Sequence, residues 1–471
     1  NLEPYDVAVV GGGIAGATCA THFAEQGLRV ALIEKGSGLI DGPPICHLHA
    51  GGNLYRELDD EQCDQLLKQS IDMVRLYPQT LNIRPTVIAT PITDNNAPSS
   101  LLPRLLQLQS RYKQLIDSDS RNKVLGEPEQ YYTLYDYDEL KLLQQSTLNT
   151  PPKTTDDWVA RFARHVDLDQ LKYPLVVANE PGWSVFRVAA SAQLTLFSKK
   201  NADVFLNTEL LGAEHRDNHW VLTVNQDTPS TIKATYFVNA CGFETGTVDD
   251  MVGFDQQRLV EFKAAYVSQW YAEPSEYWPE VIFHGERGTP QGMAQLTPYG
   301  DGVFQLHGMT QDITLFKQGL TASNAHSAQP KLDKAYSKKI KQGWSEEVLN
   351  HRTQRAIEHI SQFLPAFSTA TPNGKALFGA QQIPGKDATR RVADVSFEKN
   401  NYARVEVIKG SSALEAALKM TKEWKLSHHA QLSIEEQHPM TTSHSQEAVE
   451  ALAIALCEQR GYPVGLAKVI K

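Results

Sequence analysis

The stretch YDVAVVGGGIAGATCATHFAEQGLRVALIEK, residues 5–35, carries the clearest structural signal in the chain. It opens with a β-branched run at residues 7–10 that suits a buried parallel strand, and three glycines in G-x-G-x-x-G spacing follow. Small and apolar residues then recur at helical spacing over residues 14–26, and Gly27 ends that helix. A second strand over residues 29–33 completes a βαβ unit, which is the arrangement that binds dinucleotides.

Each glycine of the triplet has its own mechanical task. Gly11 makes the tight turn, Gly13 lets the backbone approach a pyrophosphate, and Gly16 lets the helix pack closely on the strand. The phosphates then meet a helix N-terminus, where N–H groups without partners attract anions. Glu34, at the end of the second strand, is placed to accept hydrogen bonds from a ribose and would repel the phosphate of NADP. The dinucleotide contacts predicted in this unit are Gly11, Gly13, Ile14, Ala15, Gly16, Glu34 and Lys35.

The composition is that of an ordinary folded protein. Its 471 residues allow one to three domains, and 41% hydrophobic with 21% charged residues lies far from the composition of disordered chains. The 45 basic and 55 acidic residues give a net charge of -10, which argues against a general nucleic-acid binder. The five cysteines are scattered without a C-x-x-C pair, so neither a disulfide framework nor a zinc site is expected. Without a signal peptide or a long apolar run, we expect a cytoplasmic protein with no membrane span.

A single dinucleotide is expected, because no second G-x-G-x-x-G following a strand occurs in the chain. The sequence also lacks G-x-x-x-x-G-K-[ST], H-E-x-x-H and G-x-S-x-G motifs and the paired cysteines of disulfide reductases. The absence of these motifs favours an enzyme that oxidises the substrate itself. The fingerprint alone leaves open whether the dinucleotide is FAD or NAD.

Later segments resemble the FAD-dependent oxidoreductases of the D-amino-acid oxidase (DAO) superfamily. Residues 202–226 look like the strand and meander that hold the adenine of FAD, and residues 234–246, with V-x-A-x-G, look like the strand and turn that close over the cofactor. Residues 372–379 and 402–417 resemble the last flavin segment of the family. The resemblance implies FAD as the cofactor, with further contacts from Leu210, Ala240, Gly242, Gly379, Lys409, Gly410, Ser411 and Ser412.

The last of these segments also has a physical interpretation. Its pattern predicts a strand over residues 403–408, a loop over residues 409–412 and a helix over residues 413–424. In the family this helix N-terminus faces the pyrimidine edge of the flavin, where it stabilises negative charge on the reduced ring by roughly 0.3 to 1 kcal/mol. Lys409 either adds to that effect or is a solvated lysine at the edge of the loop.

The resemblance implies an α/β fold, in which an FAD-binding, Rossmann-like domain of the glutathione-reductase type carries a discontinuous α+β substrate domain with a mixed sheet. The spacing within the substrate domain predicts a helix over residues 102–117 and strands over residues 259–270 and 303–308. We expect residues 1–80, 170–250 and 365–425 in the FAD-binding domain, residues 81–169 and 251–364 in the substrate domain, and residues 426–471 in a C-terminal helical extension.

A loop after the second strand resembles segments that lie beside the flavin in related enzymes. His49, Ala50 and Gly51 are similar to the H-A-G segment of 2-hydroxyglutarate-type dehydrogenases and, more loosely, to the H-A-A segment of methylated-glycine dehydrogenases. The resemblance implies that His49 either packs near the ring or bonds covalently to it. His47 lies two residues away, but no third ligand has metal-site spacing, so no metal is predicted. Arg56 is either an anchor for a substrate carboxylate or an exposed residue at a helix start.

Residues 293–310, MAQLTPYGDGVFQLHGMT, look like the family hairpin whose return strand reaches the active site. Its polar candidates are Gln295, His307 and Thr310. His307 either takes a proton from a hydroxyl or ammonium group while the substrate gives hydride to flavin N5, or is a sheet histidine hydrogen-bonded to its neighbours. Alignment against the flavin can also suffice without a side-chain base. The predicted catalytic residues are His49, His307 and Arg56.

The sequence therefore predicts an FAD-dependent oxidase or dehydrogenase that oxidises a C–H bond next to an amine or hydroxyl of a small acid. Electrons would pass to oxygen, a quinone or a carrier. A 2-hydroxy-acid dehydrogenase of the 2-hydroxyglutarate or malate type is the nearest alternative. A flavin-holding partner protein without catalysis and an NAD-dependent dehydrogenase are the others.

Overall fold

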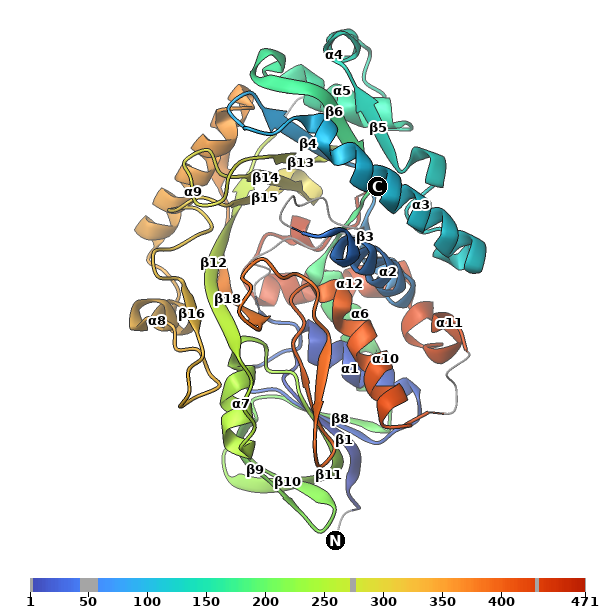
Figure 1. Ribbon diagram of the computed structural model, residues 1–471, viewed down its shortest axis with the longest axis vertical. Helices are drawn as coiled ribbons and strands as arrows, with labels where there is room; N and C mark the ends of the chain where they lie inside the picture. Colours follow the sequence, from blue (N-terminus) through green and yellow to red (C-terminus); the bar gives the residue numbers. More distant parts are fainter. Residues whose placement is uncertain (1–2, 43–57, 272–276, 428–431, 471) are drawn as a thin grey trace.

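The computed structural model describes residues 3–42, 58–271, 277–427 and 432–470. Two sheets form the frame of the molecule (Figure 1). The first lies at the end that holds the N-terminus, and the second lies at the opposite end. Helices fill the space between the sheets and cover the outer face of the second.

The first sheet is built mainly from parallel strands in the order β20-β11-β1-β2-β8. Strand β19 pairs antiparallel with β20, and β9 and β10 add an antiparallel meander beside β11. Val9 lies opposite Leu32 on one side and Val238 on the other, so the β-branched run of β1 is buried at the centre. The strands are Tyr5–Val10 (β1), Val30–Ile33 (β2), Ala202–Phe205 (β8), Glu209–Arg216 (β9), His219–Asn225 (β10), Pro229–Asn239 (β11), Val395–Glu398 (β19) and Tyr402–Val405 (β20).

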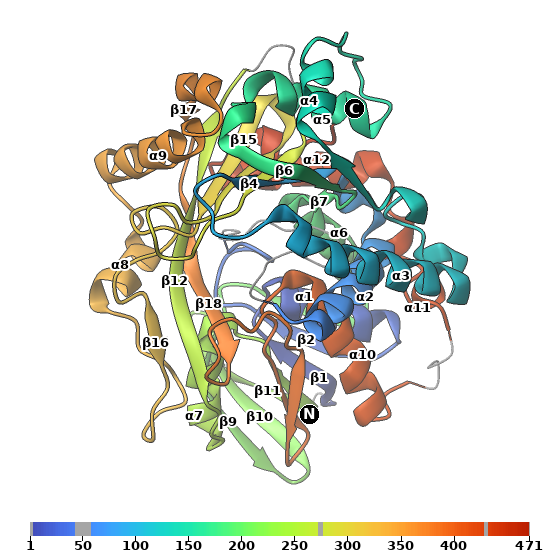
Figure 2. The same ribbon diagram turned by 45° about the horizontal axis from the view of Figure 1, so that its top comes forward.

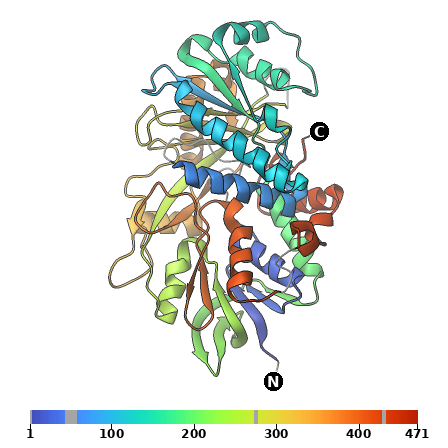
Figure 3. The ribbon, with the colours of Figure 1, turned by 45° about the vertical axis from the view of Figure 1, so that its right-hand side comes forward.

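Three helices pack together against this sheet: α1 (Ile14–Glu25), α6 (Val185–Ser198) and α10 (Ala413–Glu423). Helix α1 connects β1 to β2 and carries small residues that let its neighbours approach. Phe23 of α1 is fully buried in this layer, and burial of such a side chain contributes roughly 1.5–3 kcal/mol. The layer joins residues from both ends of the chain, because α10 lies almost 400 residues after α1 in the sequence (Figure 3).

The second sheet has the strand order β16-β12-β15-β14-β13-β4-β6-β5 and is mostly antiparallel, with β13 and β4 parallel. Strands β17 and β18 pair along β12, and β12 and β18 run side by side from the first sheet towards the far end of the molecule (Figures 1 and 2). The strands are Thr86–Pro91 (β4), Tyr132–Tyr135 (β5), Leu171–Ala178 (β6), Arg258–Gln269 (β12), Glu280–Phe283 (β13), Ala294–Pro298 (β14), Val303–Gly308 (β15), Leu320–Ala322 (β16), Thr371–Pro372 (β17) and Leu377–Pro384 (β18), with a separate pair Leu81–Asn82 (β3) and Gly182–Trp183 (β7).

The remaining helices are distributed over both sheets. Those beyond the first layer are Asp60–Leu76 (α2), Leu102–Ser118 (α3), Tyr137–Gln144 (α4), Thr155–His165 (α5), Thr245–Val252 (α7), Lys334–Gln342 (α8), Glu346–Ser361 (α9), Ile434–Gln437 (α11) and Gln446–Gln459 (α12). Helix α7 packs on β9 of the first sheet, and α12 packs on α6. Helices α5 and α9 lie on the outer face of the second sheet, and α2 lies between the two sheets.

Side-chain alternation divides the second sheet into two faces. Tyr266 and Leu306 point outward into the cluster that contains α5 and α9. Their neighbours Ala265 and Val303 point inward into the cluster that contains α2 and the helices of the first layer. We call this second side the inner face, because it looks towards the first sheet.

A buried charge cluster joins the two sheets where they approach one another. The Asp249 carboxylate of α7 accepts hydrogen bonds from Arg258 of β12 at 2.6 Å and from Arg404 of β20 at 3.0 Å. All three side chains are fully buried. Removal of one partner would leave an uncompensated buried charge. The cluster therefore holds the start of β12 against the first sheet.

The segment after α10 packs on the first layer. Arg460 donates hydrogen bonds to the carbonyl oxygens of Leu39 and Ile40, both at 2.8 Å, just beyond β2. His438 meets His22 of α1 with 2.7 Å between the ring nitrogens, and α12 packs along α6. The predicted C-terminal extension is therefore packed on the first helix layer.

The predicted fold class is confirmed, with a parallel nucleotide-binding sheet and a mixed second sheet. Strand β6 and the pair β17 and β18 lie in the second sheet, although residues 170–178 and 371–384 fall within the ranges expected for the FAD-binding domain, so the domain ranges stay a prediction. The order of motifs along the chain does not reveal such pairings, because β18 and β12 are more than one hundred residues apart in the sequence. No helix within the described residues is long and apolar enough to cross a membrane.

Candidate active site

Two glycines of the triplet are fixed by close backbone contacts. Gly11 has a φ of +100°, and a Cβ placed on it would lie 2.1 Å from the carbonyl oxygen of Ala240. A Cβ on Gly16 would lie 1.6 Å from the carbonyl oxygen of Gly11. Both distances are far shorter than any real contact, so the turn after β1 and the start of α1 depend on glycine at these positions.

Gly13 differs from its neighbours, because a Cβ at this position would meet no described residue within 4 Å. It is the N-cap of α1, no side chain caps the helix there, and its first turn, which includes Ile14 and Ala15, holds no acidic residue. An open space therefore adjoins the positive end of a helix. This is the chemistry that a pyrophosphate requires, so these residues fit the phosphates of a dinucleotide.

Glu34 is held in place beside the glycine turn. Its carboxylate accepts hydrogen bonds from the backbone N–H of Gly12 at 2.9 Å and of Gly36 at 2.5 Å. These bonds orient the carboxylate and leave further lone pairs for a ribose hydroxyl. Lys35 forms an ion pair with Glu244, and its side chain is 60% exposed.

The predicted adenine segment reaches the same region. The backbone N–H of Thr208, between β8 and β9, donates to the carbonyl oxygen of Glu34 at 3.0 Å. Leu210 follows on β9, where it is buried and lies opposite Val224. The structure therefore brings the start of the meander next to the acidic residue at the end of β2.

The carboxyl ends of β1, β11 and β20 meet at one edge of the first sheet, because the three strands are parallel. Ala240 and Gly242 follow β11 there, and Gly242 has a φ of +59° with open space around it. The predicted loop with Lys409, Gly410, Ser411 and Ser412 follows β20 and leads into α10, and Ser412 donates a hydrogen bond to Gln69 of α2 at 2.5 Å. Three predicted cofactor segments thus lie together beside the glycine turn.

Gly379 lies on β18, opposite Lys263 of β12. The Lys263 ammonium donates a hydrogen bond to Gln381 at 3.0 Å and lies 3.5 Å from Glu261. Glu261 also binds Arg287, at 2.6 Å. Burial alone raises the pKa of Glu261, but Lys263 and Arg287 outweigh it and hold that pKa below its usual value, so the carboxylate is ionised at neutral pH.

Further along the inner face, a buried ion pair supports a row of polar side chains. Glu280 of β13 pairs with Arg84 at 2.5 Å, and both side chains are at most 1% exposed. The amide nitrogen of Gln295 donates to the other oxygen of Glu280, also at 2.5 Å. Thr297 donates to the same oxygen at 3.4 Å. The ion pair therefore fixes side chains on β14.

His307 lies next to this row, because it faces Gln295 across the β14–β15 pair. It is 3% exposed, and neither ring nitrogen has a hydrogen-bond partner among the described residues. A buried polar group left unpaired costs about 1–3 kcal/mol, so it calls for an explanation, and a bound ligand supplies one. The alternative of a sheet histidine bonded to its described neighbours is not what the structure shows.

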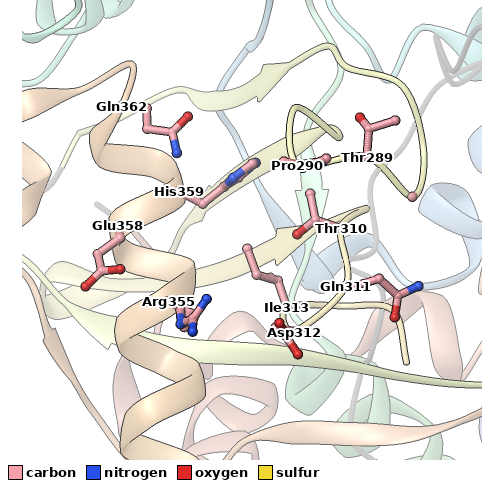
Figure 4. A pocket seen from close by; sticks show the side chains of 11 residues that line it. Thr289, Pro290, Thr310, Gln311, Asp312, Ile313, Arg355, Glu358, His359 and Gln362 are labelled. Atoms are coloured by element: carbon pink, nitrogen blue, oxygen red, sulfur yellow. The ribbon is translucent and has the colours of Figure 1, made fainter. Parts of the chain in front are cut away.

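Thr310, the third polar candidate of the hairpin, lines a different cavity of about 370 Å³ between α9 and two loops (Figure 4). His359 of α9 points into this region, and its Nε2 donates to the carbonyl oxygen of Gly292 at 3.0 Å. Burial lowers the pKa of His359, so this imidazole is neutral at physiological pH. His307 and Gln295 do not line this cavity, so Thr310 is separated from them.

Several predicted residues lie outside the part of the chain that the structure describes. These are His47, His49, Ala50, Gly51 and Arg56. Within the described part, no group of three metal-ligating side chains comes together.

The sequence interpretation missed the charged residues of the inner face, namely Arg84, Glu261, Lys263, Glu280 and Arg287. A usable signal existed in β12, where Glu261 and Lys263 alternate with the apolar residues Val260, Phe262 and Ala264. Charged residues at such spacing mark one face of a sheet that is buried on both sides.

Comparison with known proteins agrees with this arrangement. The model of the DAO family, described as FAD dependent oxidoreductase, matches residues 6–381. The fold is similar to glycine oxidase from Geobacillus kaustophilus, with a TM-score of 0.56 and 14% identity over 92% of this chain and 96% of that one. It is also similar to L-proline dehydrogenase from P. horikoshii, with a TM-score of 0.57 and 14% identity over 93% and 98% of the two chains.

Two further matches involve glycerol 3-phosphate enzymes. The glycerol-3-phosphate dehydrogenase from Bacillus halodurans, solved with FAD, has a TM-score of 0.57 and 11% identity over 99% of this chain and 81% of that one. A stretch of 73 residues is 38% identical to one subunit of the anaerobic glycerol-3-phosphate dehydrogenase of Pectobacterium atrosepticum. That stretch spans 14% of this chain and only 16% of the curated relative.

Proposed function

The chain belongs to the DAO family of FAD-dependent oxidoreductases, and on that premise we propose that it oxidises a C–H bond next to an amine or hydroxyl of a small acid. FAD is the cofactor of this enzyme, and when bound it supplies a ring that accepts hydride at N5. The family match therefore leaves no support for the NAD alternative.

The residues that we propose for FAD lie along one edge of the first sheet. The N–H groups at Gly13, Ile14 and Ala15 belong to the first turn of α1 and would hold the pyrophosphate. Glu34 would hold the ribose. Gly242 and the loop with Gly410 adjoin the same edge and would hold the more distant part of the cofactor.

The observation that carries the substrate proposal is the buried imidazole of His307 on the inner face, which has no hydrogen-bond partner in the described part of the chain. An amine or hydroxyl of the substrate would give this imidazole the partner that it lacks. A ring nitrogen that accepts a proton from that group assists the loss of hydride from the adjacent carbon. Gln295 and the ion pair of Glu280 with Arg84 would keep the surrounding wall in position.

The charges of the inner face support an acidic substrate. Arg84, Lys263 and Arg287 contribute three positive charges, whereas Glu261 and Glu280 contribute two negative charges. A carboxylate near this wall would balance the excess, and low dielectric strengthens such an interaction. Arg56 and His49 are proposed to complete the site, although both lie outside the described residues.

A second candidate is a dehydrogenase for a hydroxyl-bearing substrate, including the 2-hydroxy acids. The stretch that is 38% identical to a glycerol-3-phosphate dehydrogenase subunit favours it. His307 would accept the proton of the hydroxyl in this case too, so the imidazole alone does not separate the two candidates.

Anaerobic reduction of the bound flavin by a panel of donors tests the proposal. The panel contains matched amino and hydroxy acids together with glycerol 3-phosphate. We expect at least one small acid to bleach the flavin absorbance, and the identity of that donor decides between the two candidates. If the FAD-loaded protein bleaches with dithionite but with no member of the panel, the oxidase proposal is wrong and a non-catalytic flavoprotein is indicated.

A further inference from the structure

Lysines gather at one edge of a protein that is acidic as a whole. The stretch from Lys317 to Lys341 contains six lysines and a single acidic residue, Asp333, whereas the net charge of the chain is -10. We call the side chains Lys317, Lys331, Lys334, Lys338, Lys339 and Lys341 the basic ridge. The charge of the ridge is therefore opposite to that of the rest of the molecule.

The lysines of α8 are not needed to fold the helix. Lys334, Lys338 and Lys341 recur at i, i+4 and i+7, so they share one face. The opposite face holds Tyr336, whose ring stacks on Phe262 with centroids 4.8 Å apart. Lys339 lies over the ring of Trp344, 5.2 Å from its centroid, whereas Lys334, Lys338 and Lys341 are exposed, so this lysine face is left to solvent.

The ridge lysines also lack acidic partners. None of the six forms an ion pair with a described residue, whereas Lys35, Lys68 and Lys123 elsewhere do. Asp333 is the N-cap of α8, and its carboxylate accepts the backbone N–H of Ala335 at 2.8 Å. The positive charge of the ridge is thus not neutralised within the described protein.

The position of the ridge suits a flat partner. Helix α8 and strand β16 form a lateral edge of the molecule that stands out from β12 and β18 (Figures 1 and 2). A projecting row of lysines is the pattern by which polybasic segments are attracted to anionic lipid headgroups.

We propose that the basic ridge docks the protein on an anionic lipid surface. Lysine is depleted at protein–protein interfaces, which favour aromatic and arginine side chains, so a lysine-rich ridge argues against a protein partner. Anionic lipid headgroups attract each lysine near the surface, and several lysines in a row add their effects. The inference goes beyond the oxidation proposed above and does not depend on the identity of the substrate.

Co-sedimentation with vesicles tests the proposal on the full-length, FAD-loaded protein. The vesicles contain either phosphatidylcholine alone or phosphatidylcholine mixed with phosphatidylglycerol. We expect binding to the mixed vesicles only, with affinity that falls as salt is raised. The triple variant Lys334→Glu, Lys338→Glu and Lys341→Glu should bind the mixed vesicles at least about tenfold more weakly.

A matched control carries Lys153→Glu, Lys200→Glu and Lys233→Glu, which changes the net charge equally at exposed positions away from the ridge. It should bind like the unaltered protein. The proposal is overturned if the unaltered protein ignores mixed vesicles, binds both vesicle types equally, or binds only RNA or an acidic polypeptide. Equal losses in both variants would overturn it as well. Retained flavin absorbance shows that each variant is folded. If a Lys→Glu variant does not fold, the corresponding Lys→Gln variant is used in its place.

Discussion

The nucleotide turn and the inner face of the second sheet are built in opposite ways. At the turn, the groups that would meet the cofactor are backbone N–H groups, and glycines expose them within a span of six residues. At the inner face, the groups are side chains, and the supporting pair of Arg84 and Glu280 joins positions 196 residues apart. We therefore expect the turn to be damaged by added side-chain atoms, and the inner face to be damaged by the removal of a side chain.

The largest effect is expected for Gly16→Ala. The new Cβ would lie 1.6 Å from the carbonyl oxygen of Gly11, so α1 must move away from β1. We expect a loss of at least about 4 kcal/mol in the free energy of unfolding, or no folded protein at all. Urea denaturation followed by circular dichroism measures the loss.

Gly13→Ala is the matched control for that substitution. Its Cβ has free space, so the fold should keep its stability, while FAD binding should weaken about tenfold because the methyl group enters the proposed phosphate space. Equal stability losses for both alanine variants would contradict the contrast between a packing glycine and a binding glycine.

At the inner face, Arg84→Met should cost about 3 kcal/mol or more, because it leaves the Glu280 carboxylate buried without its partner. The double variant with Glu280→Leu should recover much of this loss, since it removes both charges together. A double-mutant cycle in thermal or urea unfolding gives the result. Additive losses would show that the two side chains are not coupled in the folded protein.

His307→Asn should act on turnover and not on folding. We expect flavin reduction by the best donor to slow by about 100-fold or more, which is typical when a group that takes up a proton is lost. The free energy of unfolding should stay the same or rise slightly, because the imidazole has no described partner to lose. Stopped-flow reduction and urea unfolding of the same preparations test the claim. A destabilised variant with normal reduction would mean that His307 is structural.

The smallest expected effect concerns the histidine pair that joins α1 to the segment after α10. Burial and the neighbouring His438 hold the pKa of His22 well below its usual value, and burial lowers the pKa of His438 as well. Both are near 6.5 in the unfolded chain, so the unfolded state binds more protons below that pH and stability falls as the pH falls.

We expect this pair to remove about 1 kcal/mol of stability between about pH 7 and pH 6, despite the nearby Glu25 and Glu435 carboxylates that oppose the shift. Urea unfolding across this range measures the slope. The variant His22→Asn with His438→Asn should show a flatter slope than the unaltered protein, and an unchanged slope would assign the pH dependence to other groups.

The sequence predicted those elements whose signals are local. The βαβ unit lies within two residues of its predicted bounds, and the predicted helix over residues 102–117 is α3, which ends one residue later. Strands β12 and β15 were likewise recognised. The family and the cofactor followed from segments with short, ordered motifs, and both are confirmed.

Features that depend on distant pairing could not be predicted in the same way. Nothing near Arg84 indicates that Glu280 is its partner, because each residue lies in a separate strand and no motif links them. The placement of β18 beside β12 depends on the same kind of long-range pairing. The role of the loop with His49 stays a prediction, as do the other proposed site residues.

The position of β20 and α10 has a consequence for how the enzyme is made in the cell. Their neighbours in the first layer, β1 and α1, leave the ribosome some 400 residues earlier. Domains tend to fold during synthesis from the N-terminal side, but this one must wait for its last strand and helix. The half-made polypeptide therefore exposes apolar surface throughout most of translation, and it should rely on chaperones until the flavin pocket closes.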